Sequence, residues 1–201
     1  MLEIIKLHQG DCLEILKTFP ENSIDCVVTS PPYWAVRDYG INNQIGLEEH
    51  PQQYIDKIVL VMKELKRVIK ETGTIWLNLG DSFYTKSGSG QGSNYLKRHQ
   101  EMDAGRGELH KAHTETRGKF KSNWLQNKQR LLIPYRIAIA CQDELGFVLR
   151  NDITWIKQIL NWKTKESFGT SMPTSVQDRL NTNSEVIFLF VKSNSYFFDL
   201  D

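Results

Sequence analysis

A run of apolar, β-branched residues that stops at two prolines is the strongest constraint on how this chain folds. Residues 24–28 (IDCVV) predict a buried strand. Pro31 and Pro32 then exclude both a helix and a continuing sheet, because each fixes its own backbone angle and lacks an N–H donor. The strand must therefore end in a rigid, extended loop. In an open α/β sheet, the carboxyl end of a strand is where ligands bind.

The loop, residues 29–34 (TSPPYW), combines hydrogen-bond acceptors with flat apolar surfaces. Ser30 offers a hydroxyl and a carbonyl, Pro31 offers a second carbonyl, and Tyr33 and Trp34 supply aromatic rings. This combination suits a planar ring that carries an amino group, such as an extruded nucleobase. The structural alternative is a strand-ending turn whose aromatic side chains pack in the core.

Helical and strand patterns alternate along the rest of the sequence, which predicts an α/β fold with a mostly parallel sheet. We expect one α/β domain over residues 1–201. The expected helices span residues 11–19, 51–71 and 131–145, with Gly73 ending the second. The expected strands span residues 4–8, 24–28, 74–79, 147–157 and 184–192, and residues 161–183 are expected to be irregular.

The segment 85–130 has a different composition and is net positive, whereas the rest of the chain is net negative. It holds ten lysines and arginines against four carboxylates, a net of +6 in a chain of net charge +1. We interpret it as a mobile insertion that orders on DNA, the alternative being a solvated loop without a role. The candidate DNA-contacting residues are Trp34, Lys97, Arg98, Arg106, Arg117, Lys119, Lys121 and Arg130.

Composition narrows the classes of protein to which this chain can belong. The sequence contains no apolar run of membrane-spanning length and no signal-peptide pattern, so we expect no membrane partner. Its three cysteines, Cys12, Cys26 and Cys141, lie far apart without metal-binding spacing. We expect reduced, buried thiols, a cytoplasmic protein and no metal site.

Ser30-Pro31-Pro32-Tyr33 after a hydrophobic strand resembles the catalytic motif of amino-group DNA methyltransferases, Asp/Asn/Ser-Pro-Pro-Tyr/Phe/Trp. The preceding order, Gly10-Asp11, a short helix and Ser23-Ile24-Asp25, resembles the start of the beta class of these enzymes, in which the catalytic half precedes the cofactor half. The resemblance implies a Rossmann-like methyltransferase sheet, mostly parallel with an antiparallel hairpin near its carboxyl edge and incomplete at the cofactor half.

The same resemblance implies methyl transfer from S-adenosylmethionine to the exocyclic amino group of a flipped base in double-stranded DNA. Ser30 and Pro31 would accept hydrogen bonds from that amino group, Pro32 would keep the loop rigid, and Tyr33 would stack on the base. Serine at this position favours cytosine N4, with adenine N6 as the alternative. Asp11 and Ser30 are the candidate cofactor contacts, and Asp11 is equally suited to cap the helix that follows it.

One expected motif does not occur in this sequence. The family cradles its cofactor with Phe-x-Gly-x-Gly after a strand, and the run Gly88–Gly92 follows no such pattern. We therefore expect a split enzyme whose second chain carries that motif, a truncated chain, or an inactive DNA-binding remnant. A cognate restriction endonuclease is a further expected partner, and an RNA or protein methyltransferase is the remaining alternative.

Overall fold

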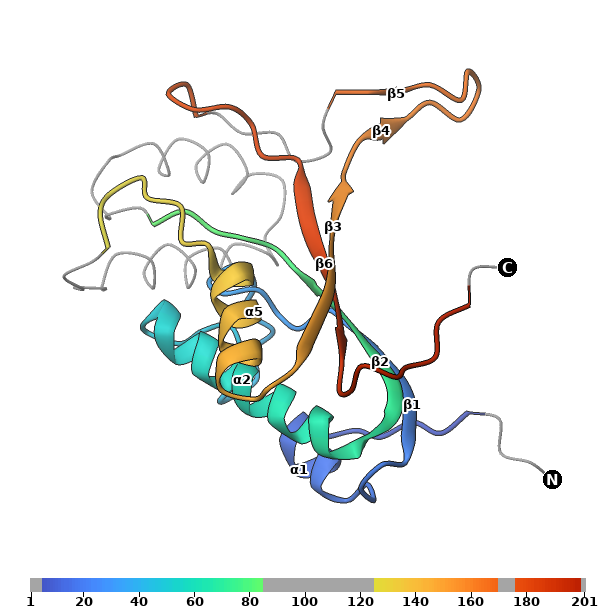
Figure 1. Ribbon diagram of the computed structural model, residues 1–201. Coiled ribbons are helices and arrows are strands. Elements are labelled where there is room, and N and C mark those ends of the chain that lie inside the picture. Colours follow the sequence, from blue (N-terminus) through green and yellow to red (C-terminus); the bar gives the residue numbers. More distant parts are fainter. Residues whose placement is uncertain (1–4, 85–124, 170–175, 200–201) are drawn as a thin grey trace.

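The computed structural model describes residues 5–84, 125–169 and 176–199, and its centre is a four-stranded sheet (Figure 1). The strands are ordered β1-β2-β6-β3, and β4 and β5 form a separate two-stranded sheet. The helices are α1 (Cys12–Lys17), α2 (Pro51–Val68) and α5 (Ile133–Asp143). The strands are β1 (Ile24–Thr29), β2 (Ile69–Leu79), β3 (Val148–Ile156), β4 (Ile159–Leu160), β5 (Ser167–Phe168) and β6 (Ser184–Val191).

The sheet is mixed. The pair β1 and β2 is parallel, as the α2 crossover between them requires, whereas β6 runs antiparallel to both β2 and β3. The strand β6 lies between β2 and β3, which places the expected antiparallel hairpin at the carboxyl side of the sheet. The α/β fold and this hairpin are thus confirmed, whereas only one of the three strand pairs described in this sheet is parallel, where a mostly parallel sheet was expected.

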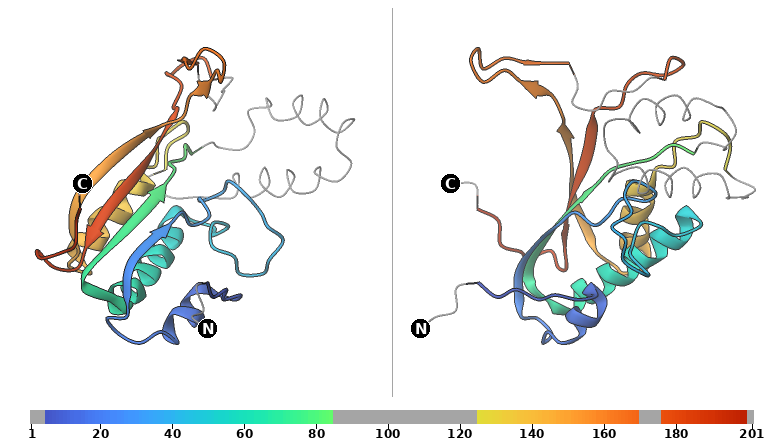
Figure 2. Two further views of the ribbon diagram at one scale, coloured as in Figure 1. Left: turned by 90° about the vertical axis from the view of Figure 1, so that its right-hand side faces the viewer. Right: turned by 180° about the vertical axis from the view of Figure 1, so that it is seen from behind.

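The core lies between the sheet and helices α2 and α5, which cover the same face (Figures 1 and 2). The apolar stripe predicted for α2 is confirmed, because Tyr54, Ile58 and Met62 are almost completely buried. From the sheet, Leu77 of β2 and Phe188 of β6 face this stripe, and both belong to the same cluster of buried side chains.

Helix α2 ends earlier than the sequence pattern predicts. It stops at Val68 rather than at Glu71, because Ile69 adopts an extended backbone conformation and pairs with Ile24 of β1. The next pair along the two strands is Cys26 with Thr74, so the register shifts at this point. Pairing between the strands therefore overrides the helical pattern over the last residues.

Other expectations also need correction. Residues 5–8 form no strand, and Leu7 is 93% exposed. The segment expected to be irregular contains the short hairpin β4–β5. Cys141 is buried as expected, but Cys12 and Cys26 are exposed, and all three are free thiols.

Part of the predicted organisation falls outside the described residues. Residues 85–124 of the basic insertion are not described, so the expected mobility of the insertion stays a prediction. Within the described part of the chain, every helix is too short or too polar to span a membrane.

Gly73 explains how β1 and β2 approach each other at the register shift. A Cβ atom there would lie 2.8 Å from the carbonyl oxygen of Asp25 and 2.5 Å from Cγ1 of Ile69. Because one of these neighbours is backbone, the clash cannot be relieved by a side-chain rotation alone.

We predict that Gly73→Ala lowers the free energy of unfolding by about 1–3 kcal/mol through this overpacking. Urea titration followed by circular dichroism measures the change. The matched control is Thr72→Ala at the exposed neighbouring position, which should leave the unfolding midpoint nearly unchanged. Equal midpoints for the two variants would contradict the packing argument.

Candidate active site

The edge of the sheet where β1 and β2 end carries a cavity of about 1080 Å³. Because the two strands are parallel, both deliver their following loops to this edge. The loop after β1 contributes residues 30–33, and the loop after β2 contributes residues 80–83. The antiparallel strand β6 begins here, so Ser184 and Glu185 also line the cavity, as do Trp155 and Lys157 at the end of β3.

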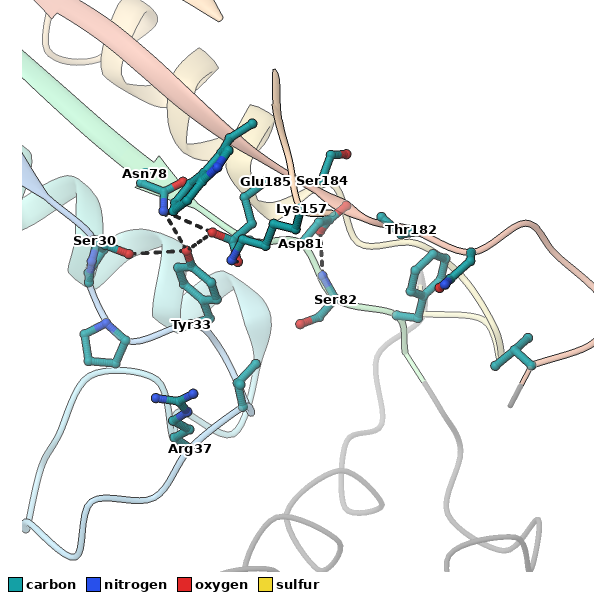
Figure 3. A pocket seen from close by; sticks show the side chains of 18 of the residues that line it. Ser30, Tyr33, Arg37, Asn78, Asp81, Ser82, Lys157, Thr182, Ser184 and Glu185 are labelled. Carbon is teal, nitrogen blue, oxygen red and sulfur yellow. Dashed lines mark hydrogen bonds and ion pairs between the residues drawn. The ribbon is translucent and has the colours of Figure 1, made fainter. Parts of the chain in front are cut away.

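A directed chain of hydrogen bonds connects the loop after β1 to the start of β6 (Figure 3). The Ser30 hydroxyl donates to the Tyr33 hydroxyl at 3.2 Å, which in turn donates to Oε2 of Glu185 at 2.8 Å. The Asn78 amide donates to the Tyr33 oxygen at 3.1 Å and to the same Glu185 oxygen at 3.0 Å. The other Glu185 oxygen accepts from the ammonium group of Lys157. The predicted loop residues are thus held by groups from β2, β3 and β6.

The network fixes the ionisation of its members. Burial alone would raise the pKa of Glu185, but hydrogen bonds from Lys157, Tyr33 and Asn78 hold this pKa below its ordinary value. Glu185 is therefore a carboxylate at neutral pH. Burial, together with the Glu185 charge, raises the pKa of Tyr33 to about 12. The phenol accordingly keeps its proton and can donate it to Glu185.

This arrangement leaves the Ser30 oxygen as an acceptor. Its proton is directed to Tyr33, so its lone pairs can receive a hydrogen bond from a group in the cavity. Tyr33 in turn transmits the polarisation of the Glu185 carboxylate toward the serine. A neutral hydroxyl is thereby coupled to a buried negative charge.

Glycine at position 80 makes room for the Tyr33 ring. A Cβ atom at Gly80 would lie 2.6 Å from Cε2 and 2.8 Å from Cδ2 of that ring. The strand β2 is therefore followed by the one residue type that permits this ring position. The aromatic ring of Tyr33 lines the cavity, and its predicted stacking on a base stays a prediction.

The loop is also anchored behind the cavity. Trp34 is 3% exposed, and its indole N–H donates to the carbonyl oxygen of Glu48 at 3.0 Å. The Glu48 carboxylate accepts from the Gly46 N–H at 2.9 Å and pairs with Lys57 at 3.0 Å. The burial of Trp34 argues against its predicted contact with DNA. The structural alternative, an aromatic side chain that packs in the core, describes this residue correctly.

Asp11 acts as the cap of helix α1. Its Oδ1 accepts from the backbone N–H groups of Leu13 at 2.9 Å and Glu14 at 3.2 Å. The structural alternative for this residue is thus confirmed, whereas a contact with the cofactor stays a prediction. Asp11 does not line the cavity formed by the loops after β1 and β2.

Arg130 is the one predicted DNA-contacting cation that falls within the described residues. Its Nε lies 2.7 Å from Oδ2 of Asp81, whose carboxylate also accepts from the N–H groups of Leu132 and Ile133 at the start of α5. Arg130 thus stabilises the beginning of that helix, and its role toward DNA stays a prediction. The other predicted cations lie outside the described residues: Lys97, Arg98, Arg106, Arg117, Lys119 and Lys121.

Sequence reasoning did not identify Glu185, Lys157 and Asn78. One signal was available, because Glu185 is a charged residue at the start of a strongly apolar strand, and such a charge needs a partner when it is buried. Asn78 breaks the apolar pattern near the end of β2 in the same way. The identity of their partner, Tyr33, depends on the fold.

A family model described as DNA methylase (N6_N4_Mtase) matches residues 24–201. The chain belongs to this DNA methylase family. The matched region begins at the first residue of β1 and includes every residue of the hydrogen-bond network.

The chain has curated relatives in bacteria. It is 37% identical over 196 residues to the Type II methyltransferase M.SfiI of Streptomyces fimbriatus, covering 97% of this chain and 38% of that protein. It is also 37% identical over 193 residues to the Type II methyltransferase M.XycI of Xanthomonas campestris pv. cyanopsidis, covering 96% and 56% respectively. The chain thus spans about two-fifths to just over half of the length of these relatives.

Solved structures share the fold of this chain. The PvuII DNA methyltransferase (cytosine-N4-specific) superposes with a TM-score of 0.54 at 20% identity, covering 93% of this chain and 48% of that one. A DNA modification methylase from Thermus thermophilus, complexed with S-adenosyl-L-methionine, superposes with a TM-score of 0.53 at 22% identity, covering 94% and 54%.

We predict that the Glu185 carboxylate gives this protein a pH-dependent part of its stability. Because its pKa is lowered in the folded state, its contribution is complete above the unfolded pKa of about 4.3 and is lost as the pH falls through the lower folded pKa. Glu185→Gln should therefore cost about 2 kcal/mol at pH 7, and the difference from the parent protein should shrink below about pH 4.5. Urea unfolding of both proteins between pH 3 and pH 7 measures it.

The matched control for that series is Glu14→Gln, which removes an exposed carboxylate that pairs with Lys17 on the helix surface. It should change stability by less than about 1 kcal/mol at any pH. A Glu185→Gln difference that stays constant or grows toward low pH would show that the carboxylate is not stabilised by its partners.

Proposed function

We propose that this chain is the catalytic part of a DNA methyltransferase that transfers a methyl group from S-adenosylmethionine to an exocyclic amino group, with cytosine N4 as the favoured acceptor. The observation that carries the proposal is the Ser30 oxygen, held as an acceptor at a cavity where two parallel strands end. Membership of the DNA methylase family supports it.

The cavity fits the reacting groups. A volume of about 1080 Å³ is slightly above the usual range for ligand pockets, which would leave room for a base beside the methyl donor. Ser30 would lie against the reacting end of the donor and Asp11 against its adenosine part. S-adenosylmethionine supplies the methyl group when it is bound. The cradle for its methionine part would come from a second chain that carries Phe-x-Gly-x-Gly.

The chain's own residues would act on the amino group of the base. The lone pair of this nitrogen is delocalised into the ring, so the nitrogen is a poor nucleophile. Acceptors at its two hydrogens, the Ser30 hydroxyl and the Pro31 carbonyl, would favour a pyramidal nitrogen and stabilise the positive charge that develops on it. The chain from Ser30 through Tyr33 to Glu185 would place a negative charge behind the first acceptor.

The adenine alternative keeps every residue in the same role. Serine at position 30 favours cytosine, and the PvuII enzyme of similar fold is named as cytosine-N4-specific. An N6-adenine methyltransferase would need the same pair of acceptors with a larger base in the cavity. The identity of the modified base therefore distinguishes the cytosine proposal from the adenine alternative.

The proposal extends to partners. Double-stranded DNA is the substrate, and the relatives are named Type II methyltransferases, which supports a restriction–modification system with a cognate endonuclease. Modification of host DNA, together with three free thiols, supports a cytoplasmic location.

Mass spectrometry of nucleosides tests the activity. DNA from a methylation-free host that expresses this chain, alone or with the second chain supplied in trans, should contain N4-methylcytosine. N6-methyladenine would support methyl transfer to an amino group but would show that the target base is adenine and not cytosine. Unmodified DNA in the presence of both chains would contradict the proposed function.

We predict that Ser30→Ala lowers kcat by about 100-fold, because one of two acceptors for the amino group is lost. The substrate KM should change much less, since the serine acts mainly on the developing charge. Initial rates of methyl transfer to duplex DNA measure both constants. Ser195→Ala, at an exposed position in the chain after β6, is the matched control and should retain full activity.

A further inference from the structure

The β4–β5 hairpin projects from the sheet as an arm (Figures 1 and 2). It starts directly after the end of β3, where Trp155 and Lys157 line the cavity. The chain continues from Lys157 into β4, turns, and returns through β5, which pairs with β4 in antiparallel fashion. The arm is thus a continuation of the strand that forms one wall of the cavity.

The tip of this arm has a defined conformation. The backbone N–H of Asn161 donates to the carbonyl oxygen of Glu166 at 2.9 Å, and that of Lys165 donates to the carbonyl oxygen of Asn161 at 2.8 Å. The Asn161 side chain accepts from the N–H groups of Lys163 and Thr164 at 3.0 and 3.4 Å. Such a turn presents its side chains without a further ordering cost.

The side chains at the tip combine an aromatic ring with positive charge. Trp162 is 75% exposed, although tryptophan is usually well buried. The ammonium group of Lys165 lies 5.5 Å from the centre of its ring, and Lys163 is its other neighbour at the turn. From residue 157 to 169 the sequence has three lysines and a single carboxylate, Glu166. An exposed aromatic ring beside two lysines of the same turn matches the chemistry of nucleic-acid contacts.

We propose that the tip of the β4–β5 hairpin contacts the DNA backbone beside the target base, with Lys163 and Lys165 on phosphates and Trp162 on the adjoining sugar or base edge. This inference rests on the proposed function, because the cavity at the base of the arm holds the target base.

The geometry sets the reach of the contact. Trp162 is five residues beyond Lys157 of the cavity, and an extended chain advances about 3.3 Å per residue, so the tip lies up to about 16 Å away. Along the axis of the double helix, each DNA strand carries one phosphate per about 3.4 Å. The contact should therefore fall within about five base pairs of the flipped base.

The salt dependence of DNA binding tests the proposal. The full chain, with the second chain wherever methyl transfer needs it, is titrated with a fluorescent duplex at several salt concentrations. Loss of two phosphate contacts in the double variant Lys163→Ala/Lys165→Ala should reduce the slope of log K against log salt by about 1.8. Trp162→Ala should weaken binding several-fold while leaving the slope nearly unchanged.

The matched control is the double variant Leu60→Ala/Lys63→Ala, which removes an exposed apolar residue and an exposed lysine from helix α2. It should bind DNA with the parent's slope and affinity. Circular dichroism establishes that all variants are folded, which the exposure of the replaced side chains leads us to expect.

The reach is tested with duplexes that contain one mismatched cytosine, because an unpaired base is extruded at the least cost and fixes the position of the protein. With flanks of ten base pairs, the hairpin variants should bind more weakly than the parent. With flanks of six base pairs, which still include the expected contact, the variants should show the same loss, and a loss seen only with flanks of ten base pairs would contradict the reach.

The outcomes separate the two proposals. DNA binding by the parent with no difference in the hairpin variants would overturn the contact and leave the proposed function intact. Absence of DNA binding by the parent at every salt concentration would overturn both.

Discussion

The buried carboxylate of Glu185 is the interaction on which the candidate site depends. Its side chain is only 6% exposed, and a charge at such a position is tolerated only when donors surround it. Those donors come from three places that are distant in sequence: the loop after β1, the end of β2 and the end of β3. One charge therefore holds the loop after β1 against the sheet.

The direction of the hydrogen bonds follows from this charge. A carboxylate can only accept, so Tyr33 must donate to it, and the tyrosine oxygen is then available to accept from Ser30. Had Glu185 been neutral, the chain could run in either direction. The acceptor character of the serine is thus determined at the other end of the network, by a residue that does not need to touch the substrate.

The local part of this architecture could be predicted from the sequence. A strand that ends just before Pro31 and the buried stripe of α2 both follow from short-range rules. The expected burial of that strand is wrong, because every residue of β1 is exposed or only partly buried and Val28 is 79% exposed. The end of α2 could not be predicted, because strand pairing at Ile69 competes with a continuous helical pattern. Residues 5–8 have a strand-like composition, but no strand of the described residues pairs with them.

The same distinction between local sequence signals and long-range contacts applies to the site. Ser30 and Tyr33 were identified because they are neighbours within one motif. Glu185 and Asn78 were not, since contacts over separations of 152 and 45 residues depend on the order of strands in the sheet. For Trp34 the motif misled the prediction. Its place in the motif suggested a contact with DNA, but its ring is buried in the core.

The strand β1 has a consequence for how the protein behaves in solution. Within the described residues it pairs with β2 on one side and with no strand on the other, and Val28 on it is 79% exposed. The backbone groups along an open strand edge are a template for pairing with another polypeptide. The strand that leads into the Ser-Pro-Pro-Tyr loop is therefore also an open edge at which another polypeptide can extend the sheet. A strand that pairs with this edge would shield it from aggregation.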